Sequence, residues 1–266
     1  MRISKFFAAL SVVAFLAPVA SHANPVVYNL ALPNISTFDN TITATGTSVQ
    51  VVQVQSGLST YGYTDAMGNA STLTVTRLNG AAAVPSGSYS SGSRTLSGAV
   101  YDISPRSSIG DSIPGRQSGL HFSFSSAVNA FGFEIGDWAT CCMNRTRPAA
   151  VQAAYGVPAV GSGLWIAFNG GAATLPANAL SALDNPGYAL ESSYTNFIGS
   201  IDSSSTFSSI DFWGDGFGEF LVAGGSFRFA SVPVGSVGEV PEPASLALVG
   251  LALAGMAVTR RRAKKA

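Results

Sequence analysis

The chain has 266 residues, 47% of them hydrophobic and only 11% charged, and its formal net charge is zero. That neutrality hides an uneven distribution, because the stretch from Asn24 to Glu239 has seven arginines, no lysine and 13 Asp and Glu, a net charge of −6. Nucleic-acid binding needs clustered basic residues that neutralise phosphates, so this acidic stretch argues against nucleic acid as a partner. It also argues against electrostatic docking on anionic lipid.

Residues 1–23 predict a cleaved signal peptide. Arg2 and Lys5 supply a positively charged start, and an apolar run follows over residues 6–20. Small residues precede the bond between Ala23 and Asn24, where we expect signal peptidase to cut. The alternative is an uncleaved N-terminal anchor, but the short run and its small-residue end suit cleavage better.

Residues 24–230 predict one all-β body. Apolar and polar residues alternate with period two over residues 72–76, 120–124 and 164–168, which is typical of half-buried strands. The Asn-Gly dipeptide at residues 169–170 suits a hairpin turn, because both residue types accept positive φ. Many short strands at this spacing predict an antiparallel β-sandwich that is jelly-roll-like.

Inward-facing aromatic and aliphatic residues of these strands form the predicted core. They are Phe122, Phe124, Phe131, Phe133, Ile166 and Phe168. Each such side chain contributes roughly 1.5 to 3 kcal/mol when buried. Residues 59–70 and 79–98, rich in Gly, Ala and Ser, predict long loops, and residues 169–188 predict one short helix. Residues 231–239 predict an extended linker.

The body contains a single histidine, His121, on the polar face of a predicted strand. One histidine argues against multi-histidine zinc and copper sites, and the Gly-x-Ser-x-Gly elbow of many hydrolases is absent from the sequence. We therefore expect a solvated histidine and a protein that is not an enzyme and binds no cofactor.

Carboxylates leave two alternatives open. Glu134 and Asp137 follow a predicted strand, whereas Asp211, Asp215 and Glu219 recur every four residues among glycines. Calcium takes several oxygen ligands from such loops, but an Asp-x-Asp-x-Asp motif is missing. A glycosidase would need two carboxylates about 5 to 9 Å apart across a cleft. We expect exposed acids without a ligand.

Cys141 and Cys142 are adjacent and are the only cysteines. Export would place them in an oxidising compartment, where free thiols are unusual. Neighbouring Cα atoms lie about 3.8 Å apart, below the usual 4.4 to 6.8 Å, so a bond between them is strained but feasible. We favour this vicinal disulfide, and free thiols or a bond to another molecule stay open. The surrounding turn either presents Trp138 and Arg145 for recognition or pins the structure.

Residues 240–266 have three parts in a fixed order. Pro241, Glu242 and Pro243 come first. An apolar run of 16 residues follows over positions 244–259, and as a helix it would cover about 24 Å, the short end of what spans a bilayer. The chain then carries the basic residues Arg260, Arg261, Arg262, Lys264 and Lys265. We predict a transmembrane helix whose basic end stays on the cytoplasmic side.

These three parts resemble a PEP-CTERM sorting signal, which occurs on envelope proteins of Gram-negative bacteria that make exopolysaccharide. The resemblance implies that a membrane-embedded protease of the exosortase type recognises the tripeptide, cuts near it and removes the tail. Residues 131–137 and 196–199 also resemble strands common in the bodies of such proteins. A plain C-terminal anchor is the alternative, but it would have no need of Pro-Glu-Pro.

The resemblance therefore implies a non-enzymatic exported protein that the C-terminal helix first anchors in the inner membrane. It then reaches the cell surface or extracellular matrix, in association with exopolysaccharide or biofilm. One alternative is a carbohydrate-binding module, in which Trp138, Trp165 or Trp213 would stack on sugar rings. A hydrolase of extracellular polymer is the third hypothesis, for which the sequence offers no catalytic constellation.

Overall fold

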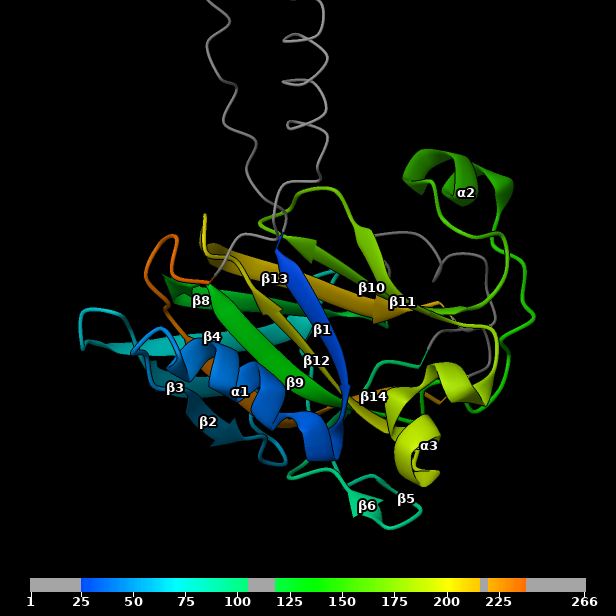
Figure 1. Cartoon of the computed structure of the whole chain (residues 1–266), viewed down its shortest axis with the longest axis horizontal. Coiled ribbons are helices and arrows are strands. Elements are labelled where there is room, and N and C mark those ends of the chain that lie inside the picture. Colours follow the sequence, from blue (N-terminus) through cyan, green and yellow to red (C-terminus); the bar gives the residue numbers. More distant parts are fainter. Residues whose placement is uncertain (1–24, 105–117, 216–219, 238–266) are drawn as a thin grey trace, which may run out of the picture.

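A computed structural model describes residues 25–104, 118–215 and 220–237. The predicted signal peptide and the predicted sorting signal lie outside these residues. Within the described ranges, every helix is too short or too polar to span a bilayer. The described chain forms two layers of β-sheet with short helices around them (Figure 1).

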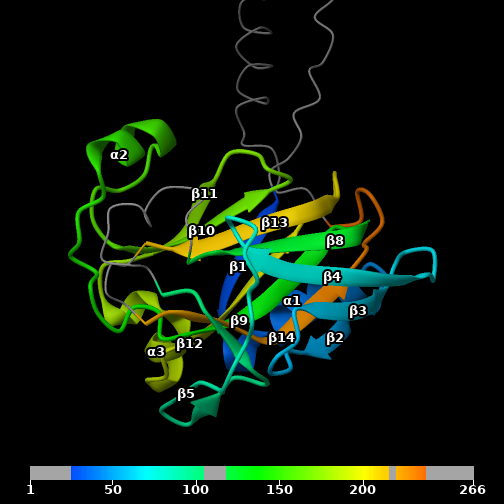
Figure 2. The same cartoon turned by 180° about the vertical axis from the view of Figure 1, so that it is seen from behind.

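Both main sheets are antiparallel and have six strands each (Figure 2). The first sheet runs β1 (Val26–Ala31), β12 (Thr195–Ile201), β9 (Ala130–Gly136), β14 (Val222–Ala230), β2 (Gln50–Gln53), with β7 (Val100–Asp102) also paired to β14. The second runs β11 (Thr174–Ala179), β10 (Ser162–Phe168), β13 (Phe207–Gly214), β8 (Leu120–Val128), β4 (Ala70–Arg77), β3 (Thr60–Thr64). A small hairpin joins β5 (Ser90–Ser91) and β6 (Arg94–Thr95). The predicted antiparallel sandwich is confirmed, and its finer jelly-roll character stays a prediction.

Aromatic side chains from both sheets meet in the core. The ring of Phe122 on β8 lies 5.0 Å from that of Phe131 and 5.1 Å from that of Phe133, both on β9. Five of the six predicted core residues are buried, and Phe168 is half-buried. Period-two alternation therefore located the strands whose side chains pack between the two sheets.

Helices cover the outer faces of the sheets. They are α1 (Ser36–Thr43), α2 (Ala149–Tyr155), α3 (Pro186–Glu191) and the 3-10 turns η1 (Leu32–Asn34) and η3 (Ala182–Asp184). Phe38 and Ile42 of α1 pack on Phe197 of β12, and Val151 of α2 packs beside Trp165 and Trp213. The sequence predicted a short helix only within residues 169–188, a range that holds η3 and the first half of α3 but also the strand β11. It missed α1 and α2 because two helical turns carry too few residues to show a period.

The predicted loop at residues 59–70 is wrong in part, because it contains β3 and the start of β4. Tyr61 and Tyr63 of β3 point into the core, while the residues between and beside them are exposed. The tyrosines alternate with Thr and Gly as strictly as aliphatic residues would. The strand was missed because the sequence prediction relied on the small, polar composition of the segment. The predicted loop over residues 79–98 likewise contains β5 and β6.

Candidate functional site

The segment that leads to the predicted sorting signal is held on the body. The backbone N–H of Val232 donates to Oδ1 of Asn129 at 2.6 Å, and Nδ2 of Asn129 donates to the carbonyl of Val232 at 2.7 Å. Asn129 is buried in the turn between β8 and β9. Its amide therefore satisfies both backbone groups of a residue that lies beyond the last strand.

A second attachment lies in the connection between β12 and β13. The N–H of Gly235 donates to the carbonyl of Ser203 at 2.8 Å, and the hydroxyl of Ser203 donates to the carbonyl of Val237 at 3.3 Å. Val232 is buried, and Val237 packs against the apolar cluster beneath α1. Residues 231–237, expected as an extended linker, are thus fastened to the sandwich.

The chain enters the body at the same end. Val26, at the start of β1, pairs with Ile201, two residues before Ser203. Figure 1 shows the bright-blue start of β1 and the orange end of the described chain on the upper side of the body. We call this region the exit end: residues 25–26, the β8–β9 turn, residues 202–206 and residues 231–237.

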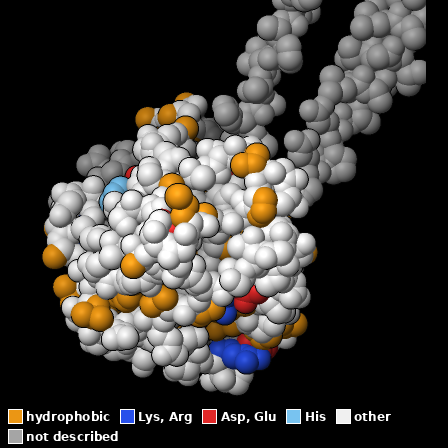
Figure 3. Space-filling view, turned by 90° about the vertical axis from the view of Figure 1, so that its left-hand side faces the viewer, with side chains coloured by type: hydrophobic (Ala, Val, Ile, Leu, Met, Phe, Trp, Pro, Cys, Tyr) orange, Lys and Arg blue, Asp and Glu red, His pale blue; other side chains and the backbone are white. Residues whose placement is uncertain are grey.

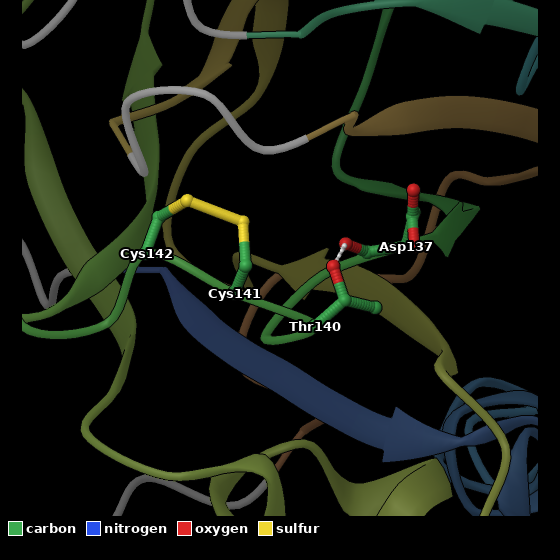
Figure 4. The surroundings of a disulfide bond; sticks show 4 residues. All are labelled: Asp137, Thr140, Cys141 and Cys142. Carbon is green, nitrogen blue, oxygen red and sulfur yellow. Dashed lines mark hydrogen bonds between the residues drawn. A yellow bond between two sulfur atoms is a disulfide. The ribbon is translucent and has the colours of Figure 1, made fainter.

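The segment after β9, residues 137–147, is the cysteine loop. Cys141 and Cys142 are joined by a disulfide with their Cα atoms 3.8 Å apart (Figure 4). Asp137, Ala139 and Cys142 all have φ near +65°. The hydroxyl of Thr140 donates to the carbonyl of Asp137 at 3.2 Å, which closes the turn that carries the disulfide.

Trp138 anchors the start of the cysteine loop. Its side chain is buried, and Nε1 donates to the carbonyl of Ser162 at 3.3 Å. The carbonyl of Trp138 accepts from Nδ2 of Asn185 at 2.8 Å. Trp138 therefore pins the structure and is not presented for recognition. Arg145 is exposed and lines a shallow hollow with Cys142 and its neighbours.

A buried ion pair anchors the other end of the cysteine loop. Nε of Arg147 donates to Oδ2 of Asp215 at 2.5 Å, and Nη2 donates to Oδ1 at 3.1 Å. Trp165 and the N–H of Gly163 also donate to this carboxylate, at 2.7 and 2.6 Å. Asn178 accepts from Nη2 at 2.6 Å. The expectation of an exposed Asp215 is wrong, because the carboxylate is needed to neutralise a buried guanidinium.

Glu134 is a second buried acid. Its oxygens accept from the N–H and the hydroxyl of Ser97, at 2.8 and 2.6 Å, and from the hydroxyl of Ser226 at 2.6 Å. Asp137 is half-buried and accepts from the hydroxyl of Tyr89 at 3.2 Å. Burial raises the pKa of Asp137 above its ordinary value. The two acids thus have separate partners, and the expectation of an exposed Glu134 is wrong.

His121 pairs with a carboxylate across two strands. Its Nδ1 lies 2.6 Å from Oδ1 of Asp211, the residue opposite it on β13. Both side chains are partly exposed. The histidine expected to be merely solvated therefore has an acidic partner, which sequence reasoning missed because the two residues are 90 positions apart.

All three tryptophans proposed as sugar-stacking residues are buried. Trp138 lies in the main core, and the rings of Trp165 and Trp213 stack on each other at 5.9 Å beneath α2. The stacking role is therefore wrong for these residues. Within the described part of the chain, acidic residues, histidine and cysteines form no group of three that could hold a metal ion.

Comparisons with known proteins locate one feature. Residues 239–262 match the PEP-CTERM protein-sorting motif. The chain thus carries a signal that implies export and recognition by an exosortase. The predicted sorting residues Pro241, Glu242, Pro243 and the basic cluster after them lie outside the described residues, as do Ala23 and Asn24. No curated protein and no solved structure matches the chain.

Proposed function

We propose that this chain is a non-enzymatic protein of the cell surface or extracellular matrix that associates with exopolysaccharide after an exosortase removes its tail. The match of residues 239–262 to the sorting motif carries the proposal. Before processing, the predicted C-terminal helix anchors the protein in the inner membrane with its basic end in the cytoplasm.

The uses of the polar groups support a structural role for the body. Asp215 neutralises Arg147, and Glu134 accepts hydrogen bonds that join β9, β14 and the segment before β7. These acids stabilise packing, and each already has its hydrogen-bond donors. They offer no pair of free carboxylates facing each other across a cleft, which polysaccharide hydrolysis requires.

The surface supports contact with neutral polysaccharide more than with a charged partner. Figure 3 shows one face on which apolar side chains are scattered and charged ones are few. Serine, threonine and asparagine side chains offer donors and acceptors that match sugar hydroxyls. Many weak contacts of this kind would retain the protein in a hydrated matrix.

A carbohydrate-binding module in the strict sense is the second candidate. Its aromatic platform would be the pair Tyr188 and Tyr194, half-buried rings that stack at 4.6 Å between centroids. Such a pair offers a flat apolar face to a sugar ring. Binding of the isolated body to a glycan array, lost in Tyr188→Ala, would favour this candidate over diffuse association.

Fractionation of cells tests the main proposal. In cells that carry the cognate exosortase and make exopolysaccharide, we expect the tail-less protein in the matrix fraction. In matched cells that lack the polysaccharide, it should move to the medium. Equal distribution in both strains would refute the association with exopolysaccharide and leave the sorting step untouched.

A further inference from the structure

The exit end lies very close to the sorting tripeptide along the chain. Only three residues separate Val237, which is fastened to the body, from Pro241. Because an extended chain covers at most about 3.6 Å per residue, the Cα of Pro241 lies within about 14 Å of the Cα of Val237. The tripeptide cannot move farther from the body while the fastening holds.

Asn129 and Ser203 set this short distance. Without their hydrogen bonds, the free chain would begin after Ala230 and would reach about 40 Å to Pro241. The side chain of Asn129 and the backbone and hydroxyl of Ser203 together remove about two thirds of that reach. The fastening therefore decides how near a bound protease comes to the sandwich.

A protease embedded in the membrane is wider than the gap that remains. A single helix with its side chains is about 10 Å across, so even a small bundle exceeds 14 Å. An enzyme that holds the tripeptide must then meet the body. We propose that the exit end is a contact surface for the membrane-embedded protease that recognises Pro241, Glu242 and Pro243, an inference that rests on the proposed sorting function.

The tip of the β3–β4 hairpin extends this surface. The hydroxyl of Ser126, close to the β8–β9 turn, donates to Oδ2 of Asp65 at 3.1 Å. Ser231 also lines a shallow pocket with Asp65 and Ala66. The start of this hairpin tip, Asp65 and Ala66, therefore lies beside Ser231, on the side of the body that is left in Figure 1 and faces the viewer in Figure 3.

The side chains of the extended surface fit a protein partner. Val234 is 79% exposed, Met67 is 87% exposed and Val26 is 39% exposed, so apolar groups project from three segments. These segments contain no lysine or arginine. The acids of the extended surface, Asp65 and Asp202, accept several hydrogen bonds each from their own turns. Docking on anionic lipid, which needs basic residues, is therefore disfavoured.

The test uses the full-length chain in cells that carry the cognate exosortase, with a pulse-chase measurement of tail removal. Val234→Arg places a charge on the proposed contact and should slow tail removal at least about fivefold, as expected for a substituted interface residue. The matched control is Val84→Arg. Val84 is 56% exposed and is followed by Pro85, whose carbonyl accepts a hydrogen bond from the N–H of Gly57. Gly57 precedes β3, so this region lies at the end of β3 away from Asp65. The control variant should be processed at the wild-type rate.

A longer tether distinguishes contact from misfolding. About twelve Gly and Ser residues inserted after Val237 add about 20 Å of flexible reach. In the Val234→Arg background this insertion should restore the wild-type rate, because the protease no longer meets the body. A misfolded body would stay slow with either tether.

Two results would overturn the contact surface: wild-type processing of Val234→Arg, or a slow Val234→Arg that the insertion does not rescue. Faster processing of Val234→Arg, with binding to vesicles that contain anionic phospholipid, would assign the exit end to lipid instead. Failure of the sorting function looks different, because a chain with alanine at all three tripeptide positions would then be cleaved as fast as wild type.

Discussion

At the exit end, neutral groups hold the chain: Asn129 and Ser203 bond to backbone groups of Val232, Gly235 and Val237. At the cysteine loop, a buried ion pair holds it, because Asp215 neutralises Arg147. Losing a neutral partner leaves unpaired backbone dipoles, whereas losing one member of the ion pair leaves a buried charge. Substitutions at the two attachments should therefore lower the free energy of unfolding by different amounts.

The largest effect should come from Asp215→Ala. It removes the counter-charge that Asp215 gives to the buried guanidinium of Arg147, so we expect the free energy of unfolding of the isolated body to fall by about 3 to 5 kcal/mol in urea denaturation. The matched control is Asp211→Ala, whose partly exposed pair with His121 should contribute less than about 1 kcal/mol. Equal losses for the two variants would contradict the assignment of a buried charge.

A smaller loss is expected from Asn129→Ala at the exit end. The N–H and carbonyl of Val232 lose their partner, and unpaired buried groups of this kind cost about 1 to 3 kcal/mol. Urea denaturation should show this loss, and limited proteolysis should cut residues 231–237 faster. Asn144→Ala, at an exposed asparagine of the cysteine loop, is the control and should change neither. Unchanged proteolysis in Asn129→Ala would show that residues 231–237 are held by other contacts.

Reduction of the disulfide should change stability less than either substitution. A bond between neighbours encloses no intervening residues, so it restricts the unfolded chain little, and Trp138 and Arg147 hold the loop independently. We expect a change below about 1 kcal/mol. The exported protein should also have an intact mass about 2 Da below that of the dithiol, without dimers on non-reducing gels. Labelling of free thiols in the native exported protein would contradict the vicinal bond.

The smallest effect concerns Asp137. Burial raises its pKa in the folded state above the ordinary 3.8, so its ionisation costs stability as pH rises through that raised pKa. Asp137→Asn keeps an acceptor for Tyr89 and tolerates the positive φ, so it should be slightly more stable than wild type at pH 7. The difference should vanish below the ordinary pKa.

Asp184→Asn should show the opposite sign. The N–H of Leu180 and other donors lower the pKa of Asp184, so this carboxylate stabilises the fold above 3.8 and the stabilisation is lost as pH falls. Comparison of unfolding at pH 7 and pH 3 checks both variants. Parallel pH profiles for the two would contradict the assigned environments.

Sequence patterns predicted the strands of the body better than the two attachments. Alternation of apolar and polar residues located β4 and β8. In β4, for example, Leu73 and Val75 face the core and the threonines between and beside them do not, so a short stretch of sequence is enough to show the period. The two attachments could not be predicted from sequence patterns, since Asn129 and Val232 are 103 positions apart and Arg147 and Asp215 are 68 apart. Such pairs exist only once the sheets have packed.

Local chemistry was more informative at the cysteines and the tail. Adjacency alone made the pair of Cys141 and Cys142 a candidate disulfide, and the order of tripeptide, apolar run and basic cluster identified the sorting motif. Buried acids were mispredicted because composition cannot tell a solvated carboxylate from one that satisfies an arginine or serines. Glu134 is buried, and its donors Ser97 and Ser226 lie 37 and 92 positions away in the chain.

The most direct test of the sorting assignment replaces Pro241, Glu242 and Pro243 together with alanine in the full-length chain. The apolar run and the basic cluster remain, so the protein should still stop in the inner membrane, since moving each Lys or Arg through the core costs about 2.5 to 3.5 kcal/mol. A blot of fractionated cells with the cognate exosortase should show full-length protein retained in that membrane, whereas wild type loses its tail. Cleavage and release of the alanine variant at the wild-type rate would make the tail an ordinary anchor and contradict the account.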